Sequence, residues 1–143
     1  MTGTTDPHDL HRFVSAQLGI YEQALAELRQ GRKTSHWMWF VFPQIAGLGR
    51  SAMSIRYALS SLDEAAAYWR HDILGPRLRA CVEALLTHPD LSAREIMGSP
   101  DDLKLRSSLT LFAHAVPDEP LFAEALRRFF DGRPDPETLA RLQ

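Results

Sequence analysis

The sequence predicts an all-α fold, a compact single-domain orthogonal bundle of about seven helices. Apolar residues recur at three- and four-residue steps, as in the series Leu10, Phe13, Val14. Serines and prolines stand where helices would begin, and glycines stand where they would end. Only one short apolar run would suit a strand equally well. We therefore expect at least half of the chain to be helical, with no sheet larger than a single hairpin.

The composition is that of one ordinary globular domain. The chain has 143 residues, of which 45% are hydrophobic and 24% are charged. A formal net charge of -2 speaks against general nucleic-acid binding and against binding to an anionic membrane. No apolar run approaches the roughly 20 residues that span a bilayer, and the start does not resemble a signal peptide. These features predict a cytoplasmic protein, and they leave its oligomeric state open.

The first half of the chain divides into four predicted elements. Residues 1–8 are polar and are expected to form a flexible lead-in to a single domain over residues 9–143. The apolar period then predicts one long helix up to Gly31, which would follow its C-terminus as a cap. A short buried helix is predicted between Ser35 and Pro43, where a strand is the alternative because aromatic and β-branched residues fill the run. A glycine-rich loop over residues 47–49 would lead into the fourth element, a helix that Ser51 caps.

Capping signals mark the starts of the later helices. Ser61 with Glu64, and Ser92 with Glu95, each read as a capping box. Pro76 after Gly75 and Pro100 after Ser99 are each expected in the first turn of a helix. Ser99 is the expected N-cap of the second of these helices, which is long. The predicted helices have the ranges 51–59, 61–70, 76–88, 92–97, 99–115, 119–130 and 136–142. The lone cysteine, Cys81, lies on the apolar side of such a run and is expected to be a buried thiol.

The first candidate site segment is residues 31–40, where two cations, two hydroxyls and a histidine stand beside two tryptophans. A central core helix would explain the aromatic residues, and we expect Trp39 and Phe40 to be buried. The indole rings beside the cations would also suit a planar base, with its phosphate held by positive charge. His36 would lie in a first helical turn, where the helix dipole keeps the imidazole neutral and available as a base. The candidate binding residues here are Arg32, Lys33, Ser35 and Trp37.

The second candidate segment is residues 99–112, a helix with polar residues on more than one face. Ion pairs at three- and four-residue spacing would explain its acids and bases as ordinary surface pairs. Small hydroxyl groups inside the helix would instead suit the floor of a groove. The candidate catalytic residues are Asp101 and Asp102, and the candidate binding residues are Lys104, Arg106 and Ser107. Both segments begin at a helix N-terminus, which attracts anions, so we expect them to meet across one electropositive pocket.

Common catalytic motifs are missing from the chain. It holds no phosphate-binding loop, no dinucleotide fingerprint and no nucleophile elbow. The six histidines lack the spacing of metal ligands, so we predict no metal site and no cofactor.

The same segments resemble a known family. The run from Ser35 to Gln44, with the sequence SHWMWFVFPQ, is similar to a signature of an uncharacterised bacterial and fungal family. Further matches lie at residues 74–78, 98–104 and 106–108, and the resemblance covers residues 9–142. Members are often labelled calpastatin-like. That label implies a disordered inhibitor of calpain, whereas this apolar and well-capped chain is expected to fold.

A more distant likeness is to the NADAR domains, small helical proteins associated with ADP-ribose or related N-glycosidic chemistry. It rests on an early Ser-His-aromatic segment, a helix that contains Trp69 and a late group of helices. The NADAR motif carries a glutamate beside its histidine, and Trp37 stands at that position here. Asp101 or Asp102 would therefore have to supply the carboxylate.

Two hypotheses follow for the function. In the first, the domain binds or hydrolyses a nucleotide-like or ADP-ribose-like ligand at its N-glycosidic bond. Asp101 or Asp102 would stabilise the ribose cation, while His36 or Lys33 would assist the leaving base. Trp37 or Trp39 would stack on that base, and Arg32 and Arg106 would hold phosphate. In the alternative, the domain is a non-catalytic helical protein-interaction module.

Overall fold

Helices make up 61% of the residues that the computed structural model describes, which are residues 6–142. Within these residues there is no β-strand, and one isolated parallel bridge joins Ile45 to Leu59. The predicted all-α class is therefore confirmed. There are ten helices in residues 6–142 against about seven predicted; four of them are only four to six residues long, and the first predicted helix is divided in two. The helices are α1 (His11–Gln17), α2 (Tyr21–Gln30), α3 (Met38–Val41), α4 (Ala52–Arg56), α5 (Leu62–Arg70), α6 (Leu74–Leu86), α7 (Ala93–Met97), α8 (Asp101–Ala115), α9 (Leu121–Phe130) and α10 (Pro136–Arg141).

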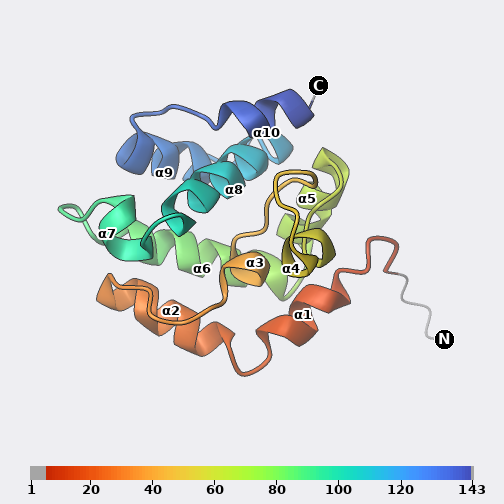
Figure 1. Cartoon of the computed structure of the whole chain (residues 1–143), viewed down its shortest axis with the longest axis horizontal. Coiled ribbons are helices and arrows are strands. Elements are labelled where there is room, and N and C mark those ends of the chain that lie inside the picture. The colour runs from red at the N-terminus through yellow and green to blue at the C-terminus, as the bar shows by residue number, and fades with distance from the viewer. Residues whose placement is uncertain (1–5, 143) are drawn as a thin grey trace.

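The helices are arranged around α6 and α8. Helices α1 and α2 lie along one side of the molecule and α9 and α10 along the opposite side, with α5, α6 and α8 between them (Figure 1). Helix α6 packs against α2, α5 and α9, while α8 packs against α5, α7, α9 and α10. No helix in residues 6–142 is both long enough and apolar enough to cross a membrane.

A row of aromatic rings runs through the core from α1 to α9. The ring centroids of Phe13 and Tyr68 are 5.1 Å apart, those of Tyr68 and Phe112 are 5.6 Å apart, and those of Phe112 and Phe122 are 5.3 Å apart. All four side chains are buried. The phenol of Tyr68 is satisfied inside the core, because it donates to the carbonyl of Phe40 and accepts from the Gln17 amide. Large rings with defined contact geometry thus join α1, α5, α8 and α9.

The predicted long helix before Gly31 is in fact two helices. Gly19 has a φ of 74°, in the left-handed region, so the chain turns between α1 and α2. Leu18 fits the apolar period and would face the core of one continuous helix. The turn instead leaves this residue 81% exposed. The period on either side of the turn belongs to two separate helices, each with its own buried face.

The predicted caps have mixed outcomes. Ser51, Ser61 and Ser92 each accept a hydrogen bond from a backbone N–H in the following turn, as predicted. Only Ser92 with Glu95 forms the full predicted capping box, because the Glu64 carboxylate accepts from the N–H of Ser60 and not of Ser61. The predictions for Ser35 and Ser99 are wrong. Helix α3 begins only at Met38, and the Ser35 hydroxyl donates to the Glu27 carboxylate instead of capping it. Helix α8 begins at Asp101 behind Pro100, without a side-chain cap. Of the expected lead-in over residues 1–8, the first five residues lie outside the described part of the chain.

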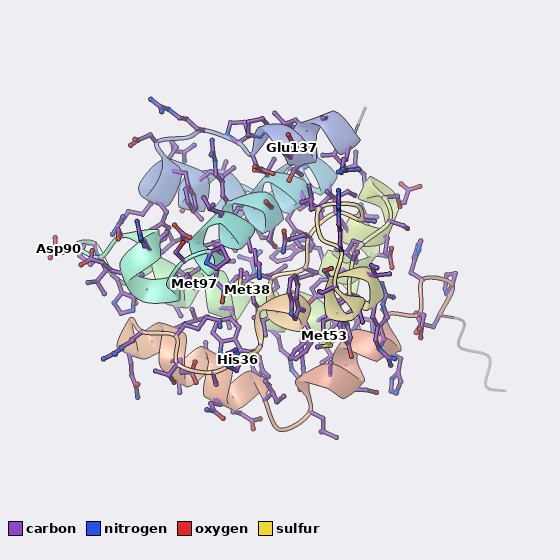
Figure 2. The ribbon with its side chains drawn as sticks, in the orientation of Figure 1. His36, Met38, Met53, Asp90, Met97 and Glu137 are labelled. Atoms are coloured by element: carbon purple, nitrogen blue, oxygen red, sulfur yellow. The ribbon has the colours of Figure 1, made fainter. Side chains whose placement is uncertain are left out.

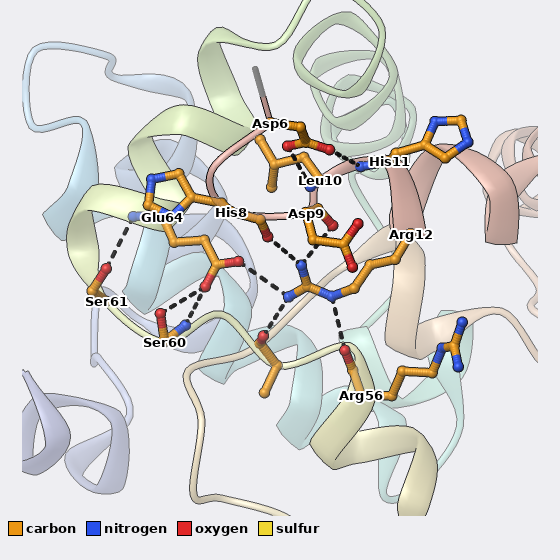
Figure 3. A network of polar contacts seen from close by, with 11 residues as sticks. Asp6, His8, Asp9, Leu10, His11, Arg12, Arg56, Ser60, Ser61 and Glu64 are labelled. Carbon is orange, nitrogen blue, oxygen red and sulfur yellow. Dashed lines mark hydrogen bonds and ion pairs between the residues drawn. The ribbon is translucent and has the colours of Figure 1, made fainter. Parts of the chain in front are cut away.

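Arg12 holds the loop after α4 in place (Figure 3). Its guanidinium donates to the carbonyl oxygens of Arg56 at 2.8 Å and Ala58 at 2.9 Å. It also donates to the buried carboxylate of Glu64 at 3.1 Å, and that carboxylate accepts the backbone N–H of Ser60 at 2.6 Å. A planar guanidinium has five donors in a fixed fork, which suits it to joining several carbonyl groups. The network therefore fixes residues 56–60 against α1 and α5.

Gly75 allows a close approach of α5 to α6, so a larger residue at this position should destabilise the fold. A Cβ atom at this position would lie 2.0 Å from the backbone oxygen of Trp69. Alanine favours a helix by about 1 kcal/mol over glycine, but overpacking against backbone costs about 1–3 kcal/mol or more. We expect Gly75→Ala to lower the free energy of unfolding, as measured by urea denaturation.

Gly49→Ala is the matched control, because its added methyl would meet the Cβ and hydroxyl of Ser54 in the short helix α4, which has no buried residue and is able to shift, and would not meet the backbone of a core helix. Its free energy of unfolding should change less than that of Gly75→Ala. Equal losses in the two variants would contradict this explanation.

Candidate functional site

The two segments singled out in the sequence lie side by side. The ammonium group of Lys33 is 2.8 Å from one oxygen of Asp101, and that of Lys104 is 3.4 Å from the other. The backbone N–H of Lys33 donates to the carbonyl of Ile96, 2.7 Å away in α7. The Lys33 side chain is 7% exposed, so its ion pair with Asp101 is shielded from solvent. Residues 31–40 and the first turn of α8 are therefore joined through one carboxylate.

Glu27 in α2 fixes the conformation of the first segment. Its carboxylate is buried and accepts hydrogen bonds from the backbone N–H groups of Thr34 and Ser35, at 2.8 and 3.1 Å. It also accepts from the Ser35 hydroxyl, from the indole N–H of Trp37 at 2.9 Å, and from the Gln23 amide. Burial raises the pKa of Glu27, but these donors outweigh it and lower the pKa to about 2. The carboxylate thus stays ionised inside the protein because every donor around it is in place.

The two neighbouring tryptophans have opposite environments. Trp37 is fully buried, and Lys33 lies 4.9 Å from the centre of its ring. Trp39 is only half-buried, and the Lys104 ammonium lies 4.0 Å from its ring centre. We predicted that Trp39 is buried in the core and that Trp37 or Trp39 stacks on a ligand, whereas the structure buries Trp37 fully and leaves Trp39 partly exposed. Trp37 packs with Phe42 in the core, at 6.0 Å between ring centres, so its faces are closed to a ligand.

A cavity of about 450 Å³ opens beside Trp39. One wall is the loop and helix between α3 and α5, with Leu48, Gly49 and Tyr57. The second wall is α8, and the third is the start of α10. The residues that line the cavity are Trp39, Gln44, Ile45, Leu48, Gly49, Ser54, Tyr57, Ala58, Pro100, Leu103, Lys104, Arg106, Ser107, Asp135 and Glu137. The network around Arg12 supports this cavity, because it holds the segment that carries Tyr57 and Ala58.

Hydrogen bonds fasten α10 to α8 along one side of the cavity. The guanidinium of Arg106 donates to the carbonyls of Arg133 and Pro134, at 2.8 and 2.9 Å. The Ser107 hydroxyl donates to Asp135 at 3.1 Å, and Asp135 in turn caps α10 by accepting from the backbone N–H of Thr138 at 3.0 Å. The α10 wall is thus placed by contacts with residues about 28 positions earlier in the chain.

The predicted binding residues divide into two groups. Lys104, Arg106 and Ser107 line the cavity. Four others do not: Arg32 is exposed, Lys33 is bound to Asp101, and Ser35 and Trp37 are bound to Glu27.

None of the three predicted catalytic residues lines the cavity. His36 is exposed and lies beside α2, on the other side of α8 from Glu137 in α10 (Figure 2). Asp101 is engaged by two ammonium groups. One oxygen of Asp102 is buried and has no hydrogen-bond partner among residues 6–142. Across the same residues, no group of three or more histidine, cysteine or acidic side chains is placed to hold a metal ion.

Several residues of the cavity were missed in the sequence. Trp37, Phe40 and Val41 follow the three- and four-residue spacing of one buried face, and this spacing places Trp39 off that face. This spacing favours Trp39 over Trp37 as the tryptophan that is open to a ligand. Asp135 and Glu137 stand at the start of the helix predicted over residues 136–142, and nothing near them in the sequence points to a cavity.

The chain belongs to a family described as a protein of unknown function, DUF1810, whose model matches residues 7–142. It is also similar to a solved structure, the crystal structure of the conserved hypothetical protein Rv1873 from Mycobacterium tuberculosis. The two chains are 51% identical, with a TM-score of 0.94, and the match covers 96% of this chain and 98% of that one. No curated protein matches the chain. These findings establish the fold and the family, and neither description names an activity.

The environment of Glu27 predicts a stability that depends on pH. Glu27→Gln keeps the size of the side chain but removes its charge, and we expect a loss of about 3 kcal/mol in the free energy of unfolding at pH 7. The pKa of Glu27 falls from an ordinary 4.5 to about 2 on folding. Its contribution is therefore complete above pH 4.5 and is lost as the pH falls through about 2.

Urea denaturation at several pH values checks this prediction. The difference between the wild type and Glu27→Gln should shrink as the pH is lowered from about 5 toward about 2. Glu22→Gln, an exposed position in the same helix, is the control and should change the free energy of unfolding by less than about 0.5 kcal/mol. A difference that stays constant with pH would refute the assignment of the stabilisation to an ionised Glu27.

Proposed function

We propose that the cavity beside Trp39 binds a nucleotide-like small molecule, with a planar ring at Trp39 and an anionic group near Lys104 and Arg106. The observation that carries the proposal is that a partly open indole face and two cations line the same cavity. Stacking of a base on an aromatic side chain contributes about 1–3 kcal/mol. Lysine and arginine add charge-assisted hydrogen bonds to phosphate.

The size and character of the cavity agree with this class of ligand. A volume of about 450 Å³ lies within the range of roughly 300–1,000 Å³ that is usual for small-molecule sites. The walls are largely apolar, and a few polar side chains project from separate elements, as in most sites that orient a small ligand. Tyr57 and Leu48 supply apolar surface, while Gln44 supplies an amide that is able both to donate and to accept.

The proposal concerns binding rather than hydrolysis. N-glycosidic hydrolysis would need a carboxylate near the ribose and a group that assists the departing base. We assigned these roles to Asp101, Asp102 and His36, and these side chains lie outside the cavity. The carboxylates that do line it belong to Asp135 and Glu137, and no histidine lines it with them. A binding protein needs only the stacking surface and the polar groups that do line it.

A protein-interaction module is the second candidate. Leu103 is 57% exposed at the cavity, and Ile55 in the adjacent α4 is 67% exposed. Exposed apolar side chains next to a concave surface are typical of sites that bind a partner chain. A protein with this function alone would not bind isolated nucleotides, so one binding experiment distinguishes the two candidates.

Isothermal titration calorimetry with a panel of mononucleotides and dinucleotides tests the proposal. We expect at least one nucleotide to bind to the wild type. Trp39→Leu should weaken that binding about 10- to 100-fold because it removes the stacking surface. Lys104→Gln should weaken it because it removes the charge beside that surface.

Trp69→Leu is the matched control. Trp69 is also half-buried with a cation over its ring, Arg79 at 4.9 Å, but it does not line the cavity. Its substitution should leave the affinity unchanged, and melting curves will show whether each variant is folded. Failure of every nucleotide to bind would refute the proposal, as would an equal loss of affinity in Trp69→Leu and Trp39→Leu.

A further inference from the structure

The α10 wall of the cavity presents carboxylate oxygens that have no partner among the described residues. Asp135 uses Oδ2 to accept from Ser107 and from the backbone N–H and hydroxyl of Thr138. No hydrogen bond in residues 6–142 reaches its second oxygen, Oδ1. Glu137 is exposed, and within the same residues neither of its oxygens has a hydrogen bond or an ion pair. Three acceptor oxygens on one wall are therefore free for a ligand.

The cations on the α8 wall are engaged in part within the protein. The Lys104 ammonium contacts Asp101 at 3.4 Å and the face of Trp39. Arg106 uses two of its nitrogen atoms to bind the carbonyls of Arg133 and Pro134. Both cations keep N–H donors for an anionic group of the ligand, while the α10 wall offers carboxylate acceptors. A carboxylate that is ionised only accepts hydrogen bonds, so its natural partners are hydroxyl or amine groups of a ligand.

The position of α10 is fixed at both of its ends. Asp135 caps its start and is itself bound by Ser107. The guanidinium of Arg141, near its end, packs against Gly47, where an added Cβ would come within 2.5 Å of Arg141. The loop with Gly47 continues into Leu48 and Gly49 of the opposite wall. The helical turn that carries Glu137 is thus held at a defined place on the wall of the cavity that Trp39 and Lys104 also line.

We propose that Glu137, assisted by Oδ1 of Asp135, accepts hydrogen bonds from the ribose hydroxyl groups of the ligand, and so selects ribonucleotides over 2′-deoxyribonucleotides. This inference rests on the proposed function, since it names the sugar of the same ligand. Two carboxylates would repel a phosphate placed beside them, which leaves the phosphate at the α8 wall and the sugar at the α10 wall. Binding of a ribose diol by a carboxylate is also the way in which dinucleotide-binding folds recognise ribose. A 2′-deoxyribonucleotide lacks one of these hydroxyl groups and would leave a carboxylate oxygen without its hydrogen bond. The ribonucleotide would therefore bind more tightly.

The test compares a ribonucleotide with its 2′-deoxy form on the wild type and on two variants. Calorimetry on the wild type should give an affinity about 10- to 100-fold higher for the ribose form, the usual effect of one hydrogen bond to a charged group. Glu137→Ala should reduce this ratio to less than about threefold. Glu137→Gln keeps one acceptor oxygen without the charge, so its ratio should lie between the two.

Glu124→Ala, an exposed glutamate in the first turn of α9 outside the cavity, is the matched control and should keep the wild-type ratio. The ratio of the two affinities separates recognition from stability, because a variant that is only destabilised would bind both ligands more weakly by the same factor. Equal affinity of the wild type for the two forms would overturn the inference and leave the proposed function intact. An unchanged ratio in Glu137→Ala, or equal loss of the ratio in Glu124→Ala, would also overturn it. Failure of the wild type to bind any nucleotide would instead overturn the proposed function, and the inference with it.

Discussion

The arrangement of the site depends on one buried carboxylate, that of Glu27. Removing an ionised carboxylate from water costs several kcal/mol unless its oxygens find donors. Glu27 finds them in the turn that leads into α3, through two backbone N–H groups, a hydroxyl and the indole of Trp37. The turn therefore forms around the carboxylate as a unit. Once it has formed, Trp37 points into the core, Trp39 faces the cavity, and Lys33 is placed to meet Asp101.

The parts of the fold that depend on neighbouring residues were predictable from the sequence. Ser61 and Ser92 cap helices through contacts three residues ahead, so the pattern contains both partners. The same reasoning did not work at Gly19, because a glycine inside a regular apolar period is compatible both with a continuous helix and with a turn. At Ser99, the backbone N–H of Asp102 binds the carbonyl of Gly98, so the first turn of α8 does not use the serine as a cap.

The cavity was only half predictable, because its walls come from distant parts of the chain. Clustered polar residues drew attention to Lys104 and Arg106, which line the cavity. Glu27, in contrast, looks like any charged residue on the solvent side of a helix, and only the folded chain shows that it is buried. The α10 wall depends on the contact between Ser107 and Asp135, which are 28 residues apart. No periodicity or spacing in one sequence reports a contact of that kind.

The charges that line the cavity have a consequence for how fast a ligand reaches it. Two cations on α8 and two carboxylates on α10 lie around one small space, so their fields largely cancel at a distance. The whole chain adds little, with a formal net charge of -2. Beyond the Debye length of about 8 Å at physiological salt, an approaching anion would feel almost no attraction. Association should then proceed at the diffusive rate of uncharged partners, on the order of 10⁵–10⁶ M⁻¹s⁻¹, and vary little with ionic strength. Discrimination between ligands would take place after entry, in the rate at which each one leaves.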